Sequence, residues 1–136
     1  MTDESVSKAD LLKCRVNVLR KEFGSDDVVV ADTLHQLGLV MASQKNWQDS
    51  ETYFREAAHI LENLSEIDSE VLSEIRLNVI ECMQERGQVK RAIAEFRKHK
   101  RELQEADMTG RLKLIVESLD LDDLEIELDA EDDDNK

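Results

Sequence analysis

Proline is absent from this chain of 136 residues, which also has only four glycines and five aromatic residues. A turn-rich β sandwich needs turn formers and is rich in β-branched and aromatic strand residues, so this composition argues against one. Leu, Glu, Lys, Arg, Gln and Ala are abundant, and these residues favour helix. The length suits one domain. The sequence therefore predicts an all-α fold.

Long apolar runs and a leader pattern are also lacking. No stretch of about 18 apolar residues exists, so we expect no segment that spans a membrane. The first ten residues have neither the basic region nor the apolar core of a signal peptide. The two cysteines, Cys14 and Cys82, lie far apart inside expected helices. Free thiols in a reducing compartment fit this pattern better than a disulfide, so we expect a cytoplasmic protein.

Positive charge is in short supply, because 18 Lys and Arg stand against 32 Asp and Glu, for a net charge of −14. A chain of this charge repels phosphate overall, so a nucleic-acid partner is not expected.

Chemistry-bearing clusters are missing as well. The histidines His35, His59 and His99 are dispersed, and no Cys/His group has metal-ligand spacing. The glycines are isolated, so no glycine-rich phosphate loop exists. No Ser-His-Asp or Cys-His set can be proposed from the sequence. We therefore expect no enzyme activity, no catalytic residue, no cofactor and no metal.

What the chain does contain is an internal repeat, which appears when it is shifted by 42 residues. The aligned residues match in size: Leu37 with Val79, Met41 with Met83, Trp47 with Val89, Ser50 with Ala92, and Phe54 with Phe96. A backward shift places Leu12 on Phe54, so half a repeat precedes two full ones.

Each unit has the pattern of a helical hairpin. Leu34, Leu37, Gly38 and Met41 follow the i, i+3, i+4, i+7 spacing of one helix face. Small residues at Gly38, Ser50, Ala57 and Ala92 mark where two antiparallel helices cross, with Phe54 and Phe96 beside them. The helix boundaries are predicted from five residues: Gly24 and Gly87 as helix ends, Asn46 as an N-cap, and Ser25 or Asp26 as another. An unrelated helical bundle is the alternative.

These residues resemble tetratricopeptide repeats, in particular the 42-residue type of kinesin light chains. The residues in agreement are Gly24, Asp26, Val30, Ala31, Thr33, Leu34, Leu37, Gly38, Trp47, Phe54, Ala57, Gly87, Ala92 and Phe96. The resemblance implies a short right-handed α-solenoid over 5–119. Its parts are a half repeat at 5–24, repeats at 26–64 and 68–105, and a capping helix at 108–119. Disorder is expected for 1–4 and for the acidic tail at 120–136.

In that family the first helix of each pair lines a concave groove. The positions that the resemblance places there are Asp32, His35, Gln36, Leu39, Ala42 and Ser43 from the first repeat, and Glu74, Leu77, Asn78, Glu81, Gln84 and Glu85 from the second. Asn78 matches the asparagine that holds a bound peptide backbone in related proteins, since an amide both donates and accepts.

The expected function is a non-catalytic adaptor or scaffold that binds a peptide or partner helix. Four groove positions are acidic and none is basic, so the expected partner is basic or neutral. An ordinary solvated surface is the alternative for these carboxylates. Two and a half repeats are few for a self-standing array. The alternative function is therefore a structural subunit, a homo-oligomer that self-associates through its uncapped N-terminal hairpin.

Two charged segments complete the sequence. The basic patch Arg97, Lys98, Lys100 and Arg101 is open to three interpretations: a nuclear localisation signal that permits nuclear shuttling, a phosphate-binding patch, or a solvated helix end. Residues 117–136 carry a net charge of −10. This tail is open to interpretation as an interaction segment that folds on a partner or on the basic patch, or as a solubilising segment. Leu112, Val116, Leu119 and Leu121 also have the spacing of a leucine-rich nuclear export signal.

Overall fold

The computed structural model describes residues 4–66, 68–106 and 111–118, which contain six α-helices and no strand. The helices are α1 (Glu4–Phe23), α2 (Val28–Ser43), α3 (Trp47–Glu62), α4 (Ser69–Glu85), α5 (Val89–Glu105) and α6 (Arg111–Ser118). α1 begins at Glu4, inside the segment expected to be disordered. Residues 108–110 and 119, which were assigned to the capping helix, lie outside the described residues.

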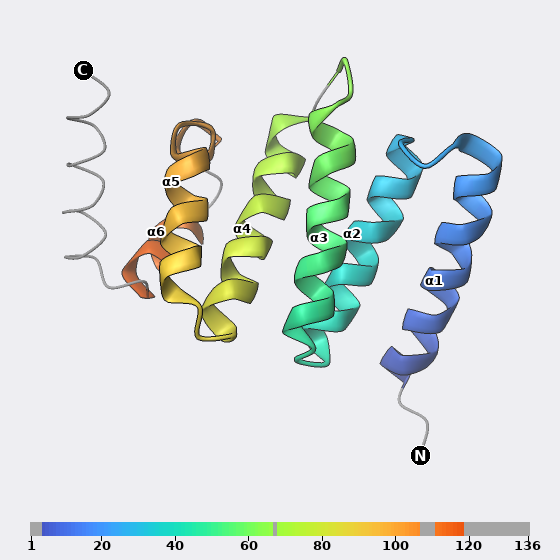
Figure 1. Ribbon diagram of the computed structural model, residues 1–136, viewed down its shortest axis with the longest axis horizontal. Coiled ribbons are helices and arrows are strands. Elements are labelled where there is room, and N and C mark those ends of the chain that lie inside the picture. Colours follow the sequence, from blue (N-terminus) through green and yellow to red (C-terminus); the bar gives the residue numbers. More distant parts are fainter. Residues whose placement is uncertain (1–3, 67, 107–110, 119–136) are drawn as a thin grey trace.

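The first five helices stand side by side in chain order, and each runs antiparallel to the next (Figure 1). α6 turns back and contacts α4. The prediction of an all-α array of consecutive helical hairpins is therefore confirmed. No helix in the described ranges is long and apolar enough to cross a bilayer.

Local signals explain where the helices begin and end. Gly24 and Gly87 have φ angles of +90° and +74°, the left-handed conformation that glycine adopts without steric cost. The amide nitrogen of Asp49 donates to the side-chain oxygen of Asn46, which confirms Asn46 as an N-cap. The cap of α2 is Asp27, which accepts from the amide of Val29 at 2.9 Å, so the prediction of Ser25 or Asp26 is wrong.

The crossing of α2 and α3 depends on small residues. A Cβ atom added to Gly38 would lie 2.6 Å from Cε1 of the buried Phe54 ring. The hydroxyl of Ser50, on α3, donates to the carbonyl oxygen of Gly38 at 2.7 Å, which ties the two backbones together. Close approach therefore requires glycine on one helix and a small polar residue on the other.

The main hydrophobic core extends through the array from Val16 on α1 to Ile115 on α6. Between them lie the large buried side chains Phe54, Ile75 and Phe96. α6 is thus packed into the array as its last layer, because Ile115 is only 5% exposed.

A buried carboxylate joins α3 to both helices of the second hairpin. Glu51 is 5% exposed and accepts hydrogen bonds from Arg55 at 2.9 Å, Arg86 at 2.9 Å and Arg91 at 3.1 Å. Burial raises the pKa of Glu51, but the hydrogen bond from Arg55, the charge of Arg91 and the hydrogen bond from Arg86 outweigh it, so this pKa is lowered. Glu51 is therefore ionised, and both of its carboxylate oxygens accept hydrogen bonds.

Candidate functional site

The face formed by α2 and α4 brings together five of the twelve residues predicted to line the groove. The Nδ2 atom of Asn78 lies 3.4 Å from the Nε2 atom of His35, which bridges the two helices. Asp32 and Glu74 act electrostatically on the same imidazole. Glu81 lies one turn along α4 and shares a partner with Asn78. These five residues form the centre of the site.

The partner that Asn78 and Glu81 share is Arg111, the first residue of α6. Its Nη2 atom donates to Oδ1 of Asn78 and to Oε2 of Glu81, the latter at 2.7 Å. Asn78 is 6% exposed, so its polar atoms need partners within the protein. The amide that was predicted to hold a ligand therefore holds a side chain of the same chain.

His35 completes the polar network as a neutral group. Burial lowers its pKa, although the carboxylates of Glu74 and Asp32 act in the opposite direction. A neutral imidazole offers one acceptor nitrogen, which suits the amide NH₂ of Asn78 as donor. The His35 ring also packs edge to face on Phe54, with centroids 5.8 Å apart. The core thus fixes the ring that orients the Asn78 amide.

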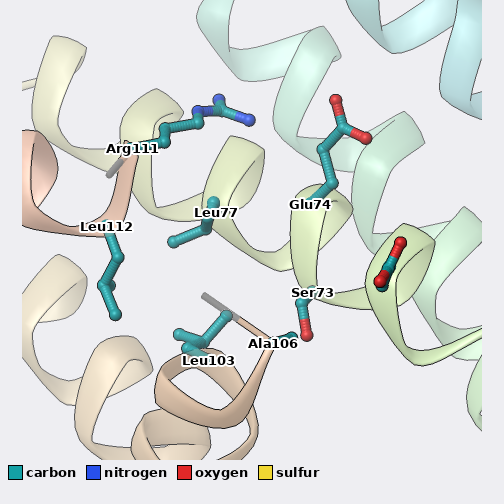
Figure 2. Close-up of a pocket in the computed structure, with 8 residues that line it drawn as sticks. Ser73, Glu74, Leu77, Leu103, Ala106, Arg111 and Leu112 are labelled. Atoms are coloured by element: carbon teal, nitrogen blue, oxygen red, sulfur yellow. The ribbon is translucent and has the colours of Figure 1, made fainter. Parts of the chain in front are cut away.

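An open cavity of about 230 Å³ lies between α4, the end of α5 and the start of α6. Leu77, Leu103 and Leu112 surround it, with Arg111 and Glu74 together on one side (Figure 2). Glu70, Ser73 and Ala106 complete the lining.

A second cavity, of about 260 Å³, lies on the other side of the first half of α4. It is the more apolar of the two, and its carboxylates are those of Asp32, Glu66 and Asp68. The apolar lining comes from α2, the end of α3 and α4: Val28, Ala31, Leu61, Leu64, Val71 and Ile75. Each cavity thus combines an apolar interior with carboxylates, and among the described residues that line the two cavities Arg111 is the only cation.

The remaining predicted groove positions do not join this centre. Gln36 donates to Asp32 at 2.9 Å, and Ser43 donates to the carbonyl of Val40 at 2.6 Å, so both are engaged within their own helix. Leu39 is 48% exposed, and Glu85 is exposed on the last turn of α4. Gln84 instead faces α6, where its amide lies 3.4 Å from the carbonyl of Ile115.

The basic patch lies on α5, where Lys98 and Arg101 are exposed and Arg97 and Lys100 are half-buried and have interactions of their own. The helix is kinked at His99, which is 8% exposed. The His99 imidazole, 3.6 Å from Glu95, and the Arg55 guanidinium lower the pKa of Glu95 to about 2, against the opposing effect of burial. A buried histidine therefore interrupts the run that the sequence presents as continuous.

Arg111 is the residue of this candidate site that the sequence did not indicate. A helix was predicted here from Leu112, Ile115, Val116 and Leu119, and Arg111–Ser118 is helical in the structure. The cation at its start was not placed in the groove, because no periodicity indicates where a long flexible side chain will find acceptors on another helix. A cation from α6 therefore lies beside the predicted groove positions, none of which is itself basic.

No group of three or more His, Cys, Asp or Glu side chains in the described part of the chain could hold a metal ion. Residues 119–136, which hold most of the tail predicted to interact or to fold back on α5 and two residues of the export pattern, lie outside the described residues. No protein-family model matches the chain, and a search of curated proteins gives no match.

Proposed function

We propose that this chain is a non-catalytic interaction module that binds a basic peptide or partner helix across the α2–α4 face, with no cofactor. The observation that carries the proposal is the pair of cavities that flank the first half of α4. Apolar pockets of this kind accept ligand side chains, and the carboxylates around them favour cationic groups beside those side chains. The resemblance to tetratricopeptide repeats agrees with this mode of action.

The proposed surface predicts a definite charge preference. A peptide of alternating leucine and lysine residues should bind the full-length chain more tightly than its charge-reversed version with glutamates, because Asp32, Glu66, Asp68, Glu70 and Glu74 line the two cavities. Fluorescence anisotropy measures both affinities, and added salt should weaken binding of the lysine peptide, since exposed charges are screened.

A double charge reversal provides the matched control for this prediction. The variant Asp32→Lys/Glu74→Lys should lose about tenfold or more in affinity for the lysine peptide at low salt. The variant Asp10→Lys/Glu22→Lys makes the same change in net charge on exposed positions of α1 and should bind almost as tightly as wild type. Tighter binding of the glutamate peptide, or equal loss in both double variants, would contradict the proposal.

A second candidate function, self-association, is favoured by the outer face of α1. Leu11 and Val18 are 71% and 52% exposed, and the free, exposed Cys14 lies between them at helical spacing. This unpartnered stripe is the surface that the N-terminal hairpin leaves open. Exposed apolar patches of this kind are typical of interaction sites.

The self-association hypothesis predicts a concentration-dependent mass. Multi-angle light scattering should give the mass of a dimer at high concentration and a monomer for Leu11→Lys, because the substitution places a charge in the apolar interface. Val89→Lys, at an apolar side chain of α5 that is 44% exposed, is the control and should leave the dimer intact. A wild-type chain that stays monomeric at the highest concentration tested excludes this function.

A further inference from the structure

α6 contacts the rest of the chain through the kinds of group that the α2–α4 face is proposed to bind, a cation and two large apolar side chains. Arg111 inserts a cation between the acceptors of Asn78 and Glu81 on the α2–α4 face. Leu112 is partly buried against the main core and lines the adjacent cavity. Ile115, one turn later, is 5% exposed.

We propose that Asn78 and Glu81 form a subsite for a cationic side chain, which Arg111 fills in the free chain and which an arginine or lysine of the bound peptide fills after displacing α6. The inference rests on the proposed function and specifies its ligand. The peptide should carry a cation, a large apolar residue next to it, and a second apolar residue three positions later, because α6 presents this pattern at Arg111, Leu112 and Ile115.

The chemistry of the subsite requires a cation. The Oε2 atom of Glu81 lies 2.7 Å from the guanidinium, and a carboxylate at this distance favours a charged donor over a neutral one. The Oδ1 atom of Asn78 is aimed at the same nitrogen because its Nδ2 atom is directed to His35. His35 thereby sets the orientation in which the amide accepts from a ligand.

The short length of α6 makes its displacement feasible. It has eight residues, and isolated helices of fewer than about 12–15 residues are marginal in water, so α6 depends on its contacts for stability. Two of its side chains add little to these contacts, since Lys113 is exposed and Leu114 is 66% exposed. The hydrogen bond from Gln84 to the carbonyl of Ile115 is long, at 3.4 Å. A peptide that offers the same groups can therefore compete with α6.

The test uses the full-length chain and a labelled synthetic peptide with the sequence of residues 108–119. The chain variant Arg111→Gln should bind this peptide about three- to tenfold more tightly than wild type. In this variant α6, which competes with the peptide, has lost one half-exposed, charge-assisted contact, and about this factor is expected for such a contact. Lys113→Gln removes the same charge from an exposed position two residues away and should not change the affinity. Thermal melting of both variants establishes that each remains folded.

Two further measurements assign the effect to the subsite. A peptide with glutamine at the position of Arg111 should bind the Arg111→Gln chain more weakly than the original peptide does. The additional chain substitution Glu81→Gln should abolish that difference, because it removes the carboxylate that pairs with the cation. In hydrogen exchange, the amides of α6 should exchange faster in wild type when the peptide is added, as expected if α6 is displaced.

The two proposals fail differently. Equal affinity of wild type and Arg111→Gln, or of the arginine and glutamine peptides, would overturn the subsite even where the lysine–leucine peptide still binds the α2–α4 face. Failure of the Asp32→Lys/Glu74→Lys variant to weaken that binding would overturn the proposed function. Equal tightening by Lys113→Gln and Arg111→Gln would show that overall charge governs affinity, and would also overturn the subsite.

Discussion

Replacing Glu51 with glutamine is expected to lower the free energy of unfolding by about 2–3 kcal/mol, because three guanidinium groups lose the buried carboxylate that they share. Glu51 is 5% exposed, and the side chains of Arg55, Arg86 and Arg91 are 41%, 27% and 48% exposed. The arginines can therefore rehydrate, which places the loss below that of a fully buried ion pair. Urea denaturation followed by circular dichroism measures it.

Another glutamate of α3, which forms a more exposed ion pair, supplies the control. Glu56 pairs with Arg20 at 2.8 Å, and its side chain is 42% exposed, so Glu56→Gln should cost less than about 1 kcal/mol. Equal losses at the two positions would show that burial of Glu51 does not contribute.

The cost at Glu51 should also depend on pH. The folded-state pKa of Glu51 is lowered from 4.5, so ionised Glu51 stabilises the fold above about pH 4.5. This stabilisation is lost as the pH falls through the folded-state pKa, where Glu51 becomes protonated in the wild type. The stability difference between wild type and Glu51→Gln should therefore be constant near neutral pH and should shrink in acid. A difference that grows in acid would contradict the assignment.

Replacing Gly38 with alanine is expected to destabilise the protein by about 2 kcal/mol, although alanine is the better helix former by about 1 kcal/mol. The added methyl group would lie 2.6–3.0 Å from three atoms of the Phe54 ring. Phe54 is 1% exposed and packed on all sides, so the ring cannot move away without disturbing the core. Thermal and urea denaturation should both show the loss.

The same contact can be tested by a double-mutant cycle. Phe54→Leu alone should destabilise the protein by about 1–2 kcal/mol, because it leaves a cavity. In the Phe54→Leu background, Gly38→Ala should cost much less than in wild type, because the ring atoms that it would meet are gone. Additive losses of stability would show that the strain does not arise between Gly38 and Phe54. No loss of stability for Gly38→Ala alone would show that α2 and α3 do not require a glycine where they cross.

The candidate site contains the acidic residues and the Asn78 amide that the sequence predicted, together with a cation, Arg111, that it did not predict. The α2–α4 face does carry the acidic residues that predict a cationic ligand, and Asn78 lies at its centre. Arg111 already meets that requirement within the free chain. In the proposed mode of binding, affinity for a partner therefore depends on competition with α6 as well as on the contacts that the partner makes.

Local signals in the sequence determined the helical hairpins. Glycine favours the positive φ angles observed at Gly24 and Gly87, and the side chain of Asn46 accepts from an amide three residues away. Both effects act over a few residues, so they can be predicted from the local sequence. The apolar stripe Leu34, Leu37 and Met41 is buried as predicted, and Phe54 lies against Gly38, where small residues predicted a helix crossing.

Long side chains that meet between helices were decided by the tertiary structure alone. Arg111 reaches Asn78 across 33 positions of sequence, and Arg91 reaches Glu51 across 40. From the sequence alone, Arg111 and Glu51 resemble solvated surface residues. Several partners lie within reach of each long, flexible side chain, and the sequence does not show which of them it meets. Packing decides which acceptors are buried, and so which pairing is formed. The sequence by itself therefore determined the array and its acidic face, whereas the fold decided that the chain fills that face with its own arginine.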